Sequence, residues 1–153
     1  IYEGTNGIQA LDLVGRKLTM HQGRLLQNLQ KEIQEFINKN KDNDDLKDFM
    51  KPLENAFQEV MASTMWLMQN GLKDPENALA SASDYLNLLA LTSMTYMWAR
   101  MAKFSIGKNE PIHKNKIKTG RYFVEKVIPE LSMYSKKVQA GKSSMMDMEV
   151  AEF

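Results

Sequence analysis

The sequence predicts an all-α protein, an up-and-down four-helix bundle preceded by a short helical segment. Apolar residues recur at intervals of three and four along most of the chain, which is the spacing of one helical face. We find no stretch with the alternating pattern of a half-buried strand. Short polar breaks separate four long segments, and adjacent antiparallel helices can bury each other's apolar faces without long crossovers.

The first predicted helix runs from about residue 7 to residue 18. Its apolar residues have mostly helical spacing, and Thr5 or Asn6 can cap its first turn. After it, Thr19 and Gln22 are spaced as a capping box, in which each side chain satisfies the other residue's backbone amide. We therefore expect the chain to change direction at this point.

The next two segments are long amphipathic helices. One begins after Gly23 and ends at the polar run 38–43, whose Asn and Asp side chains favour local turns. The other spans about 44–72. Pro52 lies inside that span and removes a backbone donor, so we expect a kink there or a start of the main helix near Lys51.

The third long helix has the clearest boundary signals. Gly71 stops the preceding helix, Asp74 is placed to cap the next one, and Pro75 occupies its first position. From residue 78 to residue 106 this helix is apolar on much of its circumference. A helix of that kind is central and is covered by its neighbours.

The last predicted helix runs from about residue 112 to residue 140, with a bend at Pro129 and an end at Gly141. A polar tail, 142–153, follows it. The tail carries three of the chain's twelve methionines and is either frayed or docked. The other methionines fall largely on apolar stripes, and we expect methionine to fill the core rather than form an adaptable binding surface.

Composition excludes several classes of function. The 20 basic and 19 acidic residues nearly cancel, so charge predicts neither nucleic acid nor an anionic membrane as a partner. The absence of cysteine excludes disulfides and thiolate zinc sites, and it fits a reducing compartment. With no apolar run of about 20 residues and no signal-peptide pattern, we expect no membrane span and a cytoplasmic location.

Other chemistry-bearing residues have simpler interpretations. His21 and His113 have no partner at the spacing of metal ligands, so no metal site is predicted. Trp66, Tyr96 and Trp98 lie in apolar stripes and are interpreted as core residues rather than a cofactor box. Lysines and an arginine gather between residues 108 and 121, where a solvated helix start is a simpler explanation than a site for a phosphate of CoA or an anionic surface.

The opening residues, I-Y-E-G-T-N-G-I-Q-A-L-D-L-V-G-R-K, resemble the active-site segment of the acyl-CoA dehydrogenases. The form of this segment looks most like the bacterial branch with an extra helical C-terminal extension, which includes 3-methylmercaptopropionyl-CoA dehydrogenases. One residue departs from the pattern. Medium-chain-type members usually have Gln two residues after the Thr, where this chain has Gly7, whereas Gln9 is retained.

The resemblance implies a function for the parent protein. Glu3 would be the catalytic base of an FAD-dependent α,β-dehydrogenation of an acyl-CoA thioester, and Gly4, Thr5 and Gln9 would contact the cofactor. The implied organisation is the end of the catalytic core at residues 1–18 and a helical bundle extension at residues 19–153. A homo-oligomeric parent is also implied.

The chain is expected to be a fragment that lacks this catalytic core. It begins within the motif, and neither a Gly-rich dinucleotide fingerprint nor an acyl-binding core precedes it. We therefore expect the chain alone to bind no flavin, to be inactive, and to hold the motif residues loosely. The alternative is a non-catalytic helical module for interaction or oligomerisation.

Overall fold

The computed structural model describes residues 4–152, and all regular structure in that range is helical, with no strand. The predicted all-α class is confirmed. The six α-helices are α1 (Thr5–Asp12), α2 (Arg24–Asn40), α3 (Lys47–Gly71), α4 (Pro75–Ser105), α5 (Pro111–Lys126) and α6 (Glu130–Ala140).

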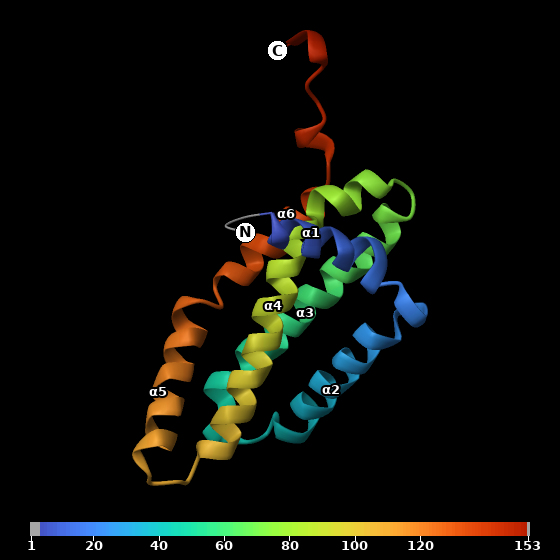
Figure 1. Ribbon diagram of the computed structural model, residues 1–153. Helices are drawn as coiled ribbons and strands as arrows, with labels where there is room; N and C mark the ends of the chain where they lie inside the picture. Colours follow the sequence, from blue (N-terminus) through green and yellow to red (C-terminus); the bar gives the residue numbers. More distant parts are fainter. Residues whose placement is uncertain (1–3, 153) are drawn as a thin grey trace.

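The helices form a bundle around a central antiparallel pair, α3 and α4 (Figure 1). Helix α2 lies along one side of this pair, and α5 and α6 together form the fourth long element on the other side. Helix α1 lies across the end of the bundle that holds the α3–α4 turn. The up-and-down arrangement with a short preceding helical segment therefore agrees with the prediction.

Helix α4 is the central helix, as its apolar circumference predicts. Its side chains contribute to each of three apolar clusters along the bundle. Tyr85, Leu88 and Ala99 are fully buried at successive levels. The predicted covering is incomplete, because four large apolar residues of α4 are exposed: Leu79, Met94, Met97 and Phe104.

The turn between α3 and α4 has the predicted signals. Helix α3 ends at Gly71, where a Cβ would lie 3.0 Å from the Cβ of Ala78, so the two helices approach closely. Asp74 Oδ1 accepts a hydrogen bond of 3.1 Å from the backbone N–H of Glu76, and Pro75 is the first residue of α4. These interactions fix the start of the central helix.

Lys142 joins the end of α6 to the start of α4. Its ammonium group lies 2.6 Å from Asp74 Oδ2 and also contacts the carboxylate of Glu76, while its backbone N–H donates to Asn77 Oδ1 at 3.2 Å. Hydrogen bonding from Lys142 lowers the pKa of Asp74, and the same bond raises the pKa of Lys142. Beyond Lys142, residues 143–152 extend away from the bundle (Figure 1).

Near Pro129 and Pro52 the helix boundaries differ from the predicted ones. The bend expected at Pro129 is a break, because α5 ends at Lys126 and α6 begins at Glu130. Pro129 has no amide hydrogen to continue the helix, and the Ile128 N–H reaches back to Phe123 O at 3.2 Å. Pro52 lies within α3, which begins at Lys47, so the prediction of a helix start near Lys51 is wrong.

The predicted capping box is also wrong. The Thr19 hydroxyl donates to the carbonyl of Arg16 at 3.1 Å and caps no amide. Three consecutive left-handed residues follow, with φ of 51° at His21, 58° at Gln22 and 76° at Gly23. These residues turn the chain into α2. The expected change of direction therefore results from left-handed backbone conformations and not from a capping box.

The prediction that methionine fills the core is wrong as well. Of the twelve methionines only Met50 is buried, and nine are exposed. Four exposed apolar residues follow helical spacing along α3 and the residue after its end: Met61, Met65, Met68 and Leu72. The predicted apolar pattern of this helix included Met61 and Met68, but both are exposed.

No helix in residues 4–152 combines the length and apolar character needed to cross a membrane.

Candidate functional site

The residues singled out by the motif lie at the start of α1. Glu3, the predicted base, falls outside the described residues. Gly4 precedes the helix with φ of 122°, a conformation that favours glycine, and no atom lies within 4 Å of where its Cβ would be. Thr5 is the first residue of α1, and both Thr5 and Gln9 are exposed.

Gln9 belongs to a network of charged side chains on the outside of α1. Lys17 Nζ donates to Gln9 Oε1 at 3.3 Å and lies 3.1 Å from Asp12 Oδ2. Arg16 makes two bonds to the Asp12 carboxylate, of 2.6 and 2.8 Å. The hydrogen bonds from Arg16 and Lys17 lower the pKa of Asp12 to about 2.

A π-helical turn, Leu13–Lys17, continues directly from α1. The Leu18 N–H bonds to Leu13 O at 3.0 Å, five residues back, which is the wider spacing of a π-turn. Single π-turns inside helices often occur at functional sites. The amphipathic pattern of the sequence does not reveal this turn.

The inner face of α1 is part of the bundle core. Ala10 and Val14 pack into an apolar cluster with Leu67, Tyr85 and Val138. Ala10 and Tyr85 are fully buried. The expectation that the motif segment is loose therefore does not apply to these residues, because the helix that follows the motif is fixed to α3, α4 and α6.

Tyr85 is a buried polar residue that the motif analysis missed. Its hydroxyl lies 2.8 Å from the Thr64 hydroxyl, and Thr64 in turn donates to the carbonyl of Val60 at 2.7 Å. Burial raises the pKa of Tyr85. The pair lies beneath α1 and satisfies its own hydrogen bonds, so it anchors the core without a group left free for catalysis.

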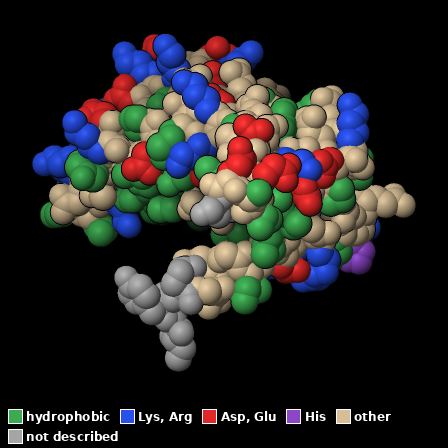
Figure 2. Space-filling view, turned by 90° about the horizontal axis from the view of Figure 1, so that it is seen from above, with side chains coloured by type: hydrophobic (Ala, Val, Ile, Leu, Met, Phe, Trp, Pro, Cys, Tyr) green, Lys and Arg blue, Asp and Glu red, His purple; other side chains and the backbone are tan. Residues whose placement is uncertain are grey.

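Two apolar side chains of α1 are exposed beside the charged network around Asp12. Ile8 is 65% exposed and Leu11 is 45% exposed. Because α1 packs one side into the core and exposes Ile8 and Leu11 on the other, it is suited to lie between the bundle and another part of a larger protein. Figure 2 views this end of the molecule from above and shows hydrophobic side chains among the charged ones.

Two apolar grooves open near the same end of the bundle. The larger, of about 380 Å³, lies between α2 and α3, and the smaller, of about 270 Å³, lies between the π-turn and the α3–α4 turn. They share Leu18, Thr19 and Met68. No residue that lines the larger groove is titratable, so it can hold an apolar group but offers no acid or base.

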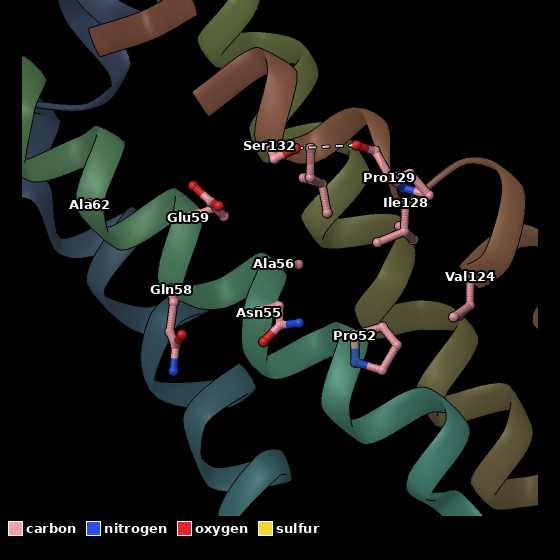
Figure 3. A pocket seen from close by; sticks show the side chains of 11 residues that line it. Pro52, Asn55, Ala56, Gln58, Glu59, Ala62, Val124, Ile128, Pro129 and Ser132 are labelled. Atoms are coloured by element: carbon pink, nitrogen blue, oxygen red, sulfur yellow. Dashed lines mark hydrogen bonds between the residues drawn. The ribbon is translucent and has the colours of Figure 1, made fainter. Parts of the chain in front are cut away.

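A third hollow, of about 500 Å³, results from the break between α5 and α6. Figure 3 shows side chains from α3 and from the region of Pro129 around it. Glu59 is the one carboxylate of its lining, and Ser132 donates to Pro129 O at 3.5 Å. This lining has no second carboxylate and no histidine, so it does not form an acid and base pair.

Of the remaining candidate residues, only Trp66 lies near α1, where it packs against the apolar cluster of Ala10 and Val14 within the described residues. The basic residues between 108 and 121 lie at and beyond the α4–α5 turn, at the opposite end of the bundle (Figure 1), so they cannot contact the same bound group as the motif residues. Tyr96 is buried, and Trp66 and Trp98 pack against apolar clusters, which confirms their interpretation as core residues. Within residues 4–152 no group of three metal-ligating side chains is present.

Comparison with known protein families identifies a match to this chain. A family model described as "Acetyl-CoA dehydrogenase C-terminal like" matches residues 29–149, most of the chain and the greater part of the bundle. The match begins within α2, so it does not include α1 or the motif residues. A search of curated proteins finds no match.

Proposed function

This chain belongs to the family of acetyl-CoA dehydrogenase C-terminal-like domains, and from that premise we propose that it is the C-terminal helical region of an FAD-dependent acyl-CoA dehydrogenase. Residues 1–18 are the end of the catalytic core in this proposal, and residues 19–153 are the helical extension. The observation that carries it is the two-faced helix α1, whose inner residue Ala10 is buried and whose outer residue Ile8 is 65% exposed. A helix of this kind suits the junction between the extension and a catalytic core.

The proposed reaction oxidises an acyl-CoA thioester to its α,β-unsaturated form. Glu3 takes the pro-R proton from the α-carbon, since a carboxylate positioned over that carbon in a dry pocket is a suitable base. FAD, when bound, would accept the hydride that leaves the β-carbon. The assignment of Glu3 rests on the resemblance of the opening motif.

The start of α1 is compatible with contact to the cofactor. Gly4 leaves space beside the backbone, and the first amides of a helix favour an anionic or polar group. The Thr5 hydroxyl and the Gln9 amide are exposed on the same helix. These residues would hold a polar part of FAD, while the flavin ring would be enclosed by the catalytic core.

The chain alone is proposed to be inactive. Its sequence contains no Gly-rich dinucleotide fingerprint, and the apolar groove between α2 and α3 has no titratable residue in its lining. The substrate site, the cofactor pocket and the subunit contacts would belong to a cytoplasmic, homo-oligomeric parent.

Spectroscopy of the parent protein tests this proposal. The parent that contains this chain should show a flavin absorbance band that bleaches on addition of an acyl-CoA, whereas the chain alone should show no flavin band after incubation with FAD. A parent that purifies without flavin and shows no acyl-CoA oxidation after reconstitution would overturn the proposal.

The second candidate is a non-catalytic helical module for interaction or oligomerisation. The uncovered stripe formed by Met61, Met65, Met68 and Leu72 favours it, because adaptable thioether surfaces are common at binding sites. This candidate predicts a partner complex that is weakened by Met65→Ser and Met68→Ser but does not depend on Glu3. Acyl-CoA oxidation that requires Glu3 would exclude it as the sole function.

A further inference from the structure

An open groove lies at the corner between the end of α4 and the start of α5. Its volume is about 470 Å³, and its lining includes Met97, Met101, Phe104 and Ile112. Phe104 is 67% exposed and Ile112 is 60% exposed. Large apolar side chains with this exposure are suited to contact another chain.

The surroundings of this groove are strongly basic. Between residues 97 and 118 the chain has six Lys or Arg residues and one acidic residue. Lys108 Nζ lies 3.1 Å from the centre of the Phe104 ring, and Lys116 Nζ lies 5.7 Å from that of Trp98. Arg100 also lines the groove, although Glu32 is 3.6 Å from its guanidinium group. The groove therefore combines an apolar floor with a cationic rim.

The tail after α6 has the complementary composition. Residues 143–152 contain three acidic residues and no Lys or Arg. Acidic and apolar residues alternate within them, and the apolar ones are at least 61% exposed: Met145, Met146, Met148 and Val150. An acidic and apolar segment fits a basic and apolar groove through both charge and burial.

The tail cannot reach the groove of its own chain. It starts beside Asn77, where the Lys142 N–H binds, and Asn77 and Phe104 are about 40 Å apart along α4 at roughly 1.5 Å per residue. A fully extended chain from Lys142 to Val150 covers at most about 29 Å. The tail and the groove lie at opposite ends of the bundle (Figure 1), so a contact between them requires two molecules.

We propose that residues 143–152 of one copy of this chain bind the α4–α5 corner groove of a second copy. Two bundles side by side and antiparallel bring each tail next to the other molecule's groove. The two contacts are then equivalent and close the pair as a two-fold dimer. This inference concerns self-association and does not depend on the proposed catalytic function.

The mass of the chain in solution tests the proposal. Sedimentation should show a dimer for the full chain and a monomer for a chain truncated after Lys142, which keeps the contacts of Lys142 to α4. A fluorescent peptide of residues 143–152 should bind the truncated chain, and its affinity should fall as salt is added. An unchanged mass after truncation, or a peptide that does not bind, would overturn the proposal.

Charge reversal locates the site. Lys116→Glu should weaken peptide binding by about tenfold or more, since like charges across an interface oppose association. Lys136→Glu, on the exposed face of α6, is the matched control and should leave binding unchanged. A peptide with Glu149→Lys should bind Lys116→Glu better than the natural peptide does. Equal binding by Lys116→Glu and Lys136→Glu would place the peptide elsewhere and contradict the proposal.

Discussion

Substitution of two glycines with positive φ can distinguish the effect of backbone strain on stability from the effect of side-chain crowding. Gly107 has φ of 79° and open space around it, whereas a Cβ at Gly141, with φ of 64°, would lie 2.7 Å from Asn77 Oδ1 and 3.0 Å from Trp66. We expect Gly107→Ala to lower the free energy of unfolding by about 1–2 kcal/mol through strain alone. Gly141→Ala should lower it by about 2–4 kcal/mol, because crowding adds to the strain. Urea denaturation measures both, and equal losses would contradict the assigned crowding.

The carboxylate of Asp12 makes a specific contribution to acid sensitivity. Its pKa in the folded state is about 2, below the ordinary value of 3.8, so its ion pairs stabilise the fold above about pH 4. That contribution is lost as the pH falls through this range toward 2. Asp12→Asn should therefore reduce the loss of stability between pH 5 and about pH 2 in acid titrations of the unfolding midpoint. Asp42→Asn, an exposed control, should keep the natural slope, and an unchanged slope in Asp12→Asn would refute the pairing.

We expect the burial of Ile128 and Leu131 to stabilise the break between α5 and α6 more than Pro129 does. Ile128 and Leu131, on either side of Pro129, are both buried in one cluster with Ala56 and Phe123. Pro129→Ala should change the free energy of unfolding by less than about 1 kcal/mol, since the break remains and the unfolded chain gains freedom. Ile128→Ala should cost about 2–5 kcal/mol through loss of core contacts. If Pro129→Ala is the more destabilising variant in chemical denaturation, burial is not the main cause.

The element boundaries show which local signals the sequence carries. The start of α4 is predicted correctly because its signals are local. The Asp74 side chain accepts from the backbone N–H two residues later, and Pro75 has a backbone angle suited to the first helical position. The turn before α2 was not predictable in the same way. His21 and Gln22 adopt left-handed conformations that are unusual for residues with a side chain, and the Thr19–Gln22 pattern suggests a different structure. The Gln27 side chain donates to the carbonyl of Gln22 at 3.1 Å within this turn, a contact that the local pattern does not reveal.

For the whole molecule, periodicity predicts the helices but not which apolar stripe is covered. The same three-and-four spacing places Leu53 in the core and Met65 and Met68 at the surface. Burial depends on the packing partner, which a single sequence does not reveal. The site residues were predicted only through the motif, and their role stays a prediction: Thr5 and Gln9 lie on α1 and Gly4 directly precedes it. The π-turn and the hydrogen bond between Tyr85 and Thr64 carry no sequence signal.

We propose that this chain is the C-terminal part of an acyl-CoA dehydrogenase whose base is Glu3. The most direct measurement is the rate of flavin bleaching by an acyl-CoA in the parent protein with Glu3→Gln. The claim predicts a loss of about 10²–10⁴-fold with the flavin absorbance band retained. The control Glu35→Gln, an exposed residue of α2 paired with Lys39, should bleach at the natural rate. A natural rate in Glu3→Gln would contradict the claim.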